Sequence, residues 1–71
     1  MNPEGPAHQL TSDLDPWEIR LVSGHVLHVN AHAYSEKSRD YVFVALMKGS
    51  PNYEIELARV PISVVKTILG G

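Results

Sequence analysis

The sequence predicts an all-β domain, built as a small five-stranded antiparallel barrel or a strongly bent sheet, behind a flexible N-terminal tail. Three observations predict this fold class. Apolar and polar residues alternate with a period of two over most of the chain after residue 16. Turn-forming clusters of Gly, Pro, Ser and Asn separate the alternating segments, and the longest apolar segment opens with four consecutive β-favouring residues. With 71 residues, the chain provides one domain.

Residues 1–15 are predicted to form a flexible acidic tail. They contain Glu4, Asp13 and Asp15 but no Lys or Arg, and their first half holds two prolines and a glycine with almost no apolar content. Such a composition buries too little apolar surface to offset the entropy lost on ordering. The folded domain is therefore expected to span residues 16–71.

The first two strands are predicted to form a hairpin. Residues 17–21 and 25–34 both alternate, and a two-residue loop would set the apolar face of one strand against the polar face of the other. A three-residue loop ending at Gly24 pairs Ile19 with Leu27 instead, which keeps both apolar rows on one side. Glycine can adopt the left-handed backbone conformation that such a loop needs.

Three further strands are expected after a polar connection. The segment 41–47 is apolar on both faces, and we predict a central strand there, although the whole stretch 35–48 has the length of a helix. Residues 53–57 alternate cleanly, with glutamates pointing outward. A last apolar segment at 64–69 follows a break at Pro61, because proline removes a donor from the ladder.

The apolar rows define the expected core. Alternation places every second residue of each strand on the same face of the sheet. The predicted inward row consists of Trp17, Ile19, Leu21, Leu27, Val29, Phe43, Ile55 and Leu57, with Val65 or Ile68 closing it.

Composition and charge exclude several classes of protein. The chain has no cysteine, which excludes disulfides and thiolate metal sites, and no apolar run approaches the ~20 residues of a membrane span. The N-terminus lacks the charged-then-apolar pattern of a signal peptide. We therefore expect a cytoplasmic protein with no membrane partner.

No motif in the chain carries recognisable chemistry, so we expect neither an enzyme nor a cofactor, and no catalytic or metal-binding residues. His28 and His32 share a face of the predicted strand but lie ~13 Å apart at the usual rise. That distance is too long for one zinc ion. A nucleophile elbow and a glycine-rich phosphate loop are both absent, and no small-molecule substrate is evident.

The favoured interpretation is a non-catalytic protein interaction or assembly module that forms a homo-oligomer. A segment that is apolar on both faces, in a chain this short, leaves one face without full cover unless a second copy or another protein covers it. The predicted interaction face is the polar side of the first hairpin and its continuation, formed by Arg20, His28, Asn30, His32 and Tyr34.

Weak binding of single-stranded nucleic acid is a second interpretation. Aromatic and basic side chains on an exposed sheet can stack bases and contact phosphates, and Arg20, Lys37 and Arg39 could cluster near Tyr34. The folded domain holds all six basic residues and five of the eight acidic ones, a net charge of +1. That charge lacks the basic footprint of typical nucleic-acid binders, so we do not expect a nucleic-acid partner.

Gly70 and Gly71 suggest a third interpretation. A chain ending in Gly-Gly resembles the ubiquitin-like proteins and the small sulfur carriers, which activate a terminal glycine carboxylate. The resemblance implies a carrier function and an α+β fold, the β-grasp, in which residues 35–48 would be a helix.

The strand interpretation resembles a different group in its layout. Five short strands, the last two joined by a tight turn around Pro61, resemble the small Sm-like and Src-homology-type barrels. This resemblance implies an architecture and carries no function with it.

Overall fold

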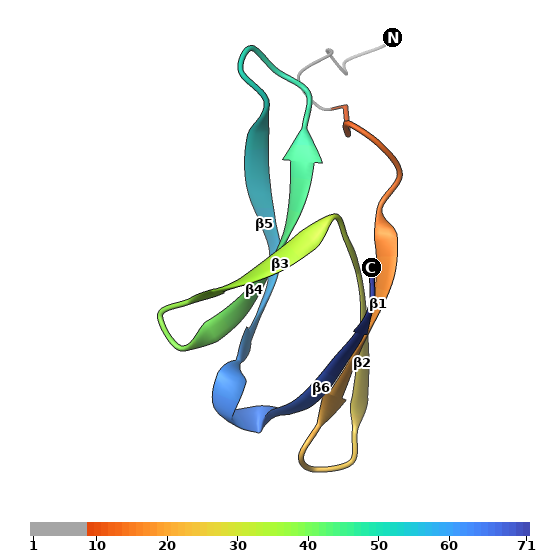
Figure 1. Ribbon diagram of the computed structural model, residues 1–71, viewed down its shortest axis with the longest axis vertical. Helices are drawn as coiled ribbons and strands as arrows, with labels where there is room; N and C mark the ends of the chain where they lie inside the picture. The colour runs from red at the N-terminus through yellow and green to blue at the C-terminus, as the bar shows by residue number, and fades with distance from the viewer. Residues whose placement is uncertain (1–8) are drawn as a thin grey trace, which may run out of the picture.

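The computed structural model describes residues 9–71 and is all-β, as the alternation predicts. Its elements are β1 (Asp15–Leu21), β2 (Val26–Ala31), β3 (Ala33–Lys37), β4 (Asp40–Met47), β5 (Tyr53–Pro61), the 3-10 turn η2 (Ile62–Val64) and β6 (Val65–Gly70). They form two three-stranded antiparallel sheets with the orders β2-β1-β6 and β3-β4-β5 (Figure 1). In the part of the chain that the structure describes, no helix is long and apolar enough to cross a membrane.

The structure describes only residues 9–15 of the predicted tail. Residues 1–8 lie outside the described residues. Leu10 forms an isolated antiparallel bridge with Met47 near the end of β4, and β1 begins at Asp15, one residue before the predicted domain boundary.

The first hairpin has the predicted register. Ile19 lies opposite Leu27, and Trp17 lies opposite Val29. Gly24 closes the loop with a φ of +95°, in the left-handed region that its position requires. The requirement that both apolar rows lie on one side of the sheet therefore predicted the loop length and the pairing correctly.

The segment of ambiguous type is a strand. β4 pairs with β3 on one side and with β5 on the other, so it is the central strand that a run apolar on both faces predicts. Among the described residues there is no α-helix to pack across a sheet. The β-grasp alternative for the fold is therefore wrong.

The predicted second strand is divided at a bend. Ala31 pairs with Asp15 in one sheet, whereas Ala33 pairs with Val44 in the other. His32 lies at the bend between them, and its N–H donates to the Val44 carbonyl oxygen at 2.9 Å. β2 and β3 are therefore consecutive strands that belong to different sheets.

The core lies where the two sheets meet. Its fully or nearly fully buried cluster consists of Ile19, Ala31, Phe43 and Val60. Several predicted members of the inward row are partly buried against it, namely Trp17, Leu21, Val29, Val65 and Ile68. The Trp17 indole N–H also donates to the Ala31 carbonyl oxygen at 3.0 Å, which ties β1 to the bend.

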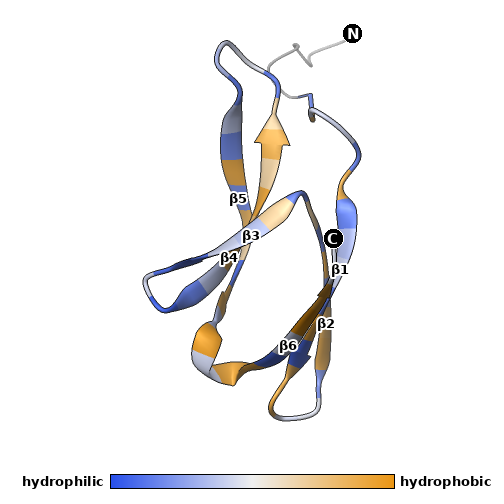
Figure 2. Cartoon of the chain, in the orientation of Figure 1, coloured by the Kyte–Doolittle hydropathy of each residue, from blue (hydrophilic) through white to orange (hydrophobic). Residues whose placement is uncertain are grey.

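The assignment of three residues to the core is wrong. Leu27, Ile55 and Leu57 are 39%, 40% and 42% exposed. Ile55 lies opposite Ala45, two residues beyond the core residue Phe43 on β4, so it occupies the core-facing side of its sheet. The β4–β5 hairpin, however, extends past the sheet of β1, β2 and β6 (Figure 1), and apolar residues continue along it into this extension (Figure 2). Among residues 9–71, no strand of the other sheet lies over Ile55 and Leu57 there.

Candidate interaction surface

The predicted polar face is only partly assembled. Arg20, His28 and Asn30 are all exposed and lie on neighbouring strands, with His28 opposite Glu18 in the register. The Arg20 Nε–H donates to the Glu18 carboxylate at 2.6 Å, so this cation already has an acidic partner. The placement of these three residues on one face depends only on the register of the first hairpin, and that register is as predicted.

His32 and Tyr34 do not lie on that face, contrary to the predicted grouping. The bend at His32 reverses the alternation, so Tyr34 turns toward the core. Its ring centroid is 5.2 Å from that of Trp17 and 5.4 Å from that of Phe43. The contact with Trp17 is edge-to-face and the contact with Phe43 is tilted. Aromatic pairs at such distances stabilise packing, and Tyr34 is therefore part of an aromatic cluster at the margin of the core.

Gly70 and Gly71 are packed against β1. Gly70 lies within β6 opposite Trp17 and has a φ of +117°, and a side chain there would overlap the Pro16 carbonyl oxygen. The Gly71 N–H donates to the same oxygen at 3.3 Å. Packing against the sheet thus explains why glycine occupies both positions. The carrier interpretation stays a prediction, without the fold that it requires.

A partly exposed apolar row runs along the side of the β4–β5 hairpin that, among residues 9–71, has no second sheet over it. The row consists of Leu10, Tyr53, Ile55 and Leu57, which are 37–42% exposed. In the register, Leu10 and Tyr53 flank the buried Met47 from either side. Ile55 follows Tyr53 at the two-residue repeat of β5, and Leu57 comes next at the irregularity where the register with β4 shifts between Phe43 and Val44. The alternation of residues 53–57 revealed these side chains, but it assigned them to the core.

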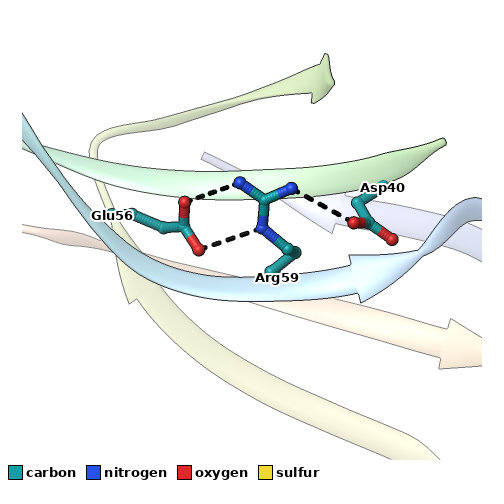
Figure 3. Close-up of polar contacts among 3 residues, drawn as sticks. All are labelled: Asp40, Glu56 and Arg59. Carbon is teal, nitrogen blue, oxygen red and sulfur yellow. Dashed lines mark hydrogen bonds and ion pairs between the residues drawn. The ribbon is translucent and has the colours of Figure 1, made fainter. Parts of the chain in front are cut away.

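The opposite face of the same hairpin carries an ionic triad, which Figure 3 shows. The Arg59 guanidinium donates to both carboxylate oxygens of Glu56, at 3.1 and 2.8 Å, and to Asp40 at 3.2 Å. Arg59 lies opposite Val42, which is only 2% exposed although it points away from the core cluster. Long charged side chains can cover apolar neighbours with their stems, so the triad shields this face of β4.

The triad shifts the ionisation of its members. The hydrogen bond from Arg59 lowers the pKa of the Glu56 carboxyl from its ordinary value of 4.5, and the hydrogen bond to Glu56 raises the pKa of Arg59. A carboxyl whose pKa is lower in the folded state stabilises the fold above its unfolded pKa. That contribution disappears as the pH falls through the folded pKa.

We therefore expect Glu56→Gln to flatten the acid side of the stability profile. The parent should lose stability faster than Glu56→Gln as the pH falls from about 5 to 3, because only the parent must protonate a carboxylate that Arg59 holds ionised. Urea unfolding at a series of pH values measures the difference. Glu54→Gln is the control, since Glu54 lies on the same face of β5 outside the triad. Equal slopes for the parent and Glu56→Gln would contradict the assignment.

The bases considered for nucleic-acid binding do not converge on one face. Arg20 belongs to β1 in one sheet, whereas Lys37 and Arg39 lie at the β3–β4 turn of the other. An open cavity of about 500 Å³ lies beside this turn, lined by Arg39, Asp40, Pro61, Ile62 and Ser63. Among residues 9–71 no group of three or more His, Asp or Glu side chains could hold a metal ion.

Comparison with known proteins does not identify a family. No family model, no curated protein and no solved structure matches the chain. The argument for function therefore rests on the geometry of the described residues.

Proposed function

We propose that the chain is a non-catalytic interaction and assembly module that works as a homo-oligomer. The observation that carries the proposal is the apolar row on the β4–β5 hairpin. It brings four large apolar side chains to one uncovered side of a sheet, and the core-facing position of that side makes it suited to a second layer. A second copy, which presents the same uncharged row, is the occupant that we assign.

Magnitudes favour a weak to moderate association. Full burial of a large apolar side chain contributes about 1.5–3 kcal/mol, so covering the exposed two-fifths of four such side chains on each copy contributes roughly 5–10 kcal/mol. Association itself costs about 4–15 kcal/mol. The two ranges overlap, so the row alone reaches assembly at high micromolar concentration, about −5 kcal/mol, only at the favourable end of both. Elsewhere in the ranges assembly needs further contacts.

The outer edge of β5 beyond Tyr53 can supply such contacts. β5 is nine residues long and is the outer strand of its sheet. A long edge strand presents unpaired main-chain donors and acceptors that favour pairing with another chain. Glu54 and Glu56 lie on the far side of the strand from the row and keep the outer face charged.

We also propose that the two sheets are parts of one strongly bent five-stranded sheet with the layout of a small barrel. The support is the single-residue bend at His32, across which the chain passes from one sheet to the other. In that layout β2 and β3 are two halves of one strand, and the hairpin arm with its apolar row projects from one end.

Sedimentation velocity tests the assembly proposal. We expect the parent to sediment as an oligomer at high micromolar concentration. Ile55→Glu should raise the dissociation constant by about 100-fold or more, because it places an unpaired charge in an apolar contact on both copies.

The matched control is Val26→Glu. Val26 is 44% exposed on β2, outside the row, so the same change of chemistry there should leave assembly as in the parent. A parent that is a pure monomer at high micromolar concentration would remove the proposal. So would equal weakening by the two variants.

A further inference from the structure

Residues 9–12 lie along the end of β4, beyond the part of that edge that β3 covers. β3 pairs with β4 only as far as Val44, because the chain bends away at His32. Past that point, Leu10 forms an antiparallel bridge with Met47. Residues 9–12 therefore take the place of a third strand beside the end of β4.

A few hydrogen bonds attach this segment to the edge. The Thr11 N–H donates to the Leu46 carbonyl oxygen at 3.0 Å, and the Lys48 N–H donates to the Gln9 carbonyl oxygen at 2.8 Å. The Thr11 hydroxyl adds a bond of 3.1 Å to the same Leu46 oxygen. Gln9 and Ser12 are exposed, so hydrogen bonds supply much of the attachment.

The His32 ring is a further link between this segment and β4. The Leu46 N–H donates to Nδ1 at 2.7 Å. A ring nitrogen that accepts a hydrogen bond carries no proton, so the proton of the neutral ring is on Nε2. Nε2 lies 2.9 Å from the Ser12 carbonyl oxygen and 3.0 Å from the Ser12 hydroxyl oxygen. The ring therefore joins Leu46 to Ser12 only in its neutral form.

A second proton on the ring is incompatible with this arrangement. A charged imidazole donates from both nitrogens, so its Nδ1–H would face the Leu46 N–H with no acceptor between them. The ring then has to leave β4. Nε2–H can keep its bond to Ser12, so the same movement draws Ser12 away from the edge. Histidine takes up this proton between about pH 5 and 8.

The charged groups near the ring favour the same movement. Asp13 follows Ser12 in the chain, and Asp15 begins β1 opposite Ala31. On the other side, the residues at the end of β4 are uncharged, and Lys48 follows them. A positive ring is attracted by the two carboxylates and repelled by the ammonium group. Protonation therefore directs the ring toward the N-terminal segment and away from β4.

We propose that His32 is a proton-operated clasp, whose neutral ring holds residues 9–12 on the edge of β4 and whose protonation releases them. Release frees the Leu46 carbonyl oxygen and the Lys48 N–H from their present partners. An edge with unpaired main-chain groups accepts another extended segment, so the clasp opens this binding position at acid pH. Release needs only one chain and is independent of the proposed self-association.

Amide hydrogen exchange, followed by NMR on the full chain, tests the clasp. The Thr11 and Lys48 amides report on the contact directly, because each donates across it. Each exchange rate is divided by the intrinsic rate of that residue at the same pH. Between about pH 8 and 5, we expect the protection of both amides to fall by at least about tenfold, as the loss of a hydrogen bond implies.

The parent contains its own internal reference. The Ile62 N–H donates to the Arg39 carbonyl oxygen at 3.0 Å, at a turn without histidine, and its protection should not change over the same range. The fall at Thr11 and Lys48 should coincide with the titration of the His32 ring signals.

His32→Asn separates protonation from the other effects of acid. The asparagine carbonyl oxygen can accept from the Leu46 N–H but takes up no proton in this range, so the protection of the Lys48 amide should be independent of pH. His28→Asn is the matched control. His28 is exposed on β2, and this variant should keep the pH dependence of the parent.

Three results would overturn the clasp. The protection of Thr11 and Lys48 could stay constant while the His32 ring titrates, or the ring could remain neutral down to about pH 5. The third is an equal pH dependence in the parent and in His32→Asn. If that variant does not fold, the comparison of amide and ring transitions in the parent decides the question alone.

Discussion

Phe43→Ala is expected to lower the free energy of unfolding by about 3–5 kcal/mol. Phe43 is fully buried at the centre of the core cluster, and its ring centroid lies 5.9 Å from that of Trp17. Truncation leaves a cavity between the sheets and removes the aromatic contacts. Small domains have a total stability near the lower end of about 5–15 kcal/mol, so the variant should be largely unfolded at 37 °C. Urea unfolding followed by tryptophan fluorescence measures the change.

Leu57→Ala is the comparison for that experiment. Both side chains were expected in the inward row, but Leu57 is 42% exposed in the apolar row. Its truncation should cost less than about 1 kcal/mol when the protein is monomeric. Similar losses for the two variants would show that the core is not where the burial places it.

Ile19→Ala is expected to cost about 2–5 kcal/mol. Ile19 is fully buried in the middle strand of its sheet, opposite Leu27 on one side and Ile68 on the other. Its side chain is the contribution of β1 to the buried cluster. Removing it loosens the packing of the β2-β1-β6 sheet on Phe43, and denaturant unfolding at neutral pH measures the loss.

Leu27→Ala provides the matched control for Ile19→Ala. The two residues are register partners on the same hairpin, yet Leu27 is 39% exposed. We expect a cost of less than half that of Ile19→Ala, because less apolar surface returns to water. A larger loss from Leu27→Ala would contradict the assigned core.

The placement of residues on one face was predictable where it depended on one hairpin. Parity along β1 and β2 places Arg20, His28 and Asn30 on one face, and the structure agrees. The same parity failed beyond Ala31, where a bend reversed it and moved Tyr34 into the aromatic cluster. A single sequence shows no signal for that bend, because neither glycine nor proline marks it.

The apolar row and the pairing of residues 9–12 with β4 were missed for a different reason. Alternation correctly predicts that Ile55 and Leu57 share the apolar side of β5, but it carries no information about whether another layer reaches them. Residues 9–12 belong to a segment that composition assigns to a flexible tail. Their pairing depends on main-chain atoms of Leu46 and Lys48 and on the ring of His32, which only folding brings together.

The sequence by itself determined the all-β class, the three-residue loop at Gly24, the register of the first hairpin and the strand character of β4. Each of these depends on local propensity or on the two-residue period, which act between near neighbours. The tertiary structure alone decided the bend at His32, the partial exposure of the apolar row on the β4–β5 hairpin and the pairing of residues 9–12 with β4. Those features depend on how far one sheet extends over the other and on which edges stay unpaired, because burial and edge pairing are properties of the assembled chain.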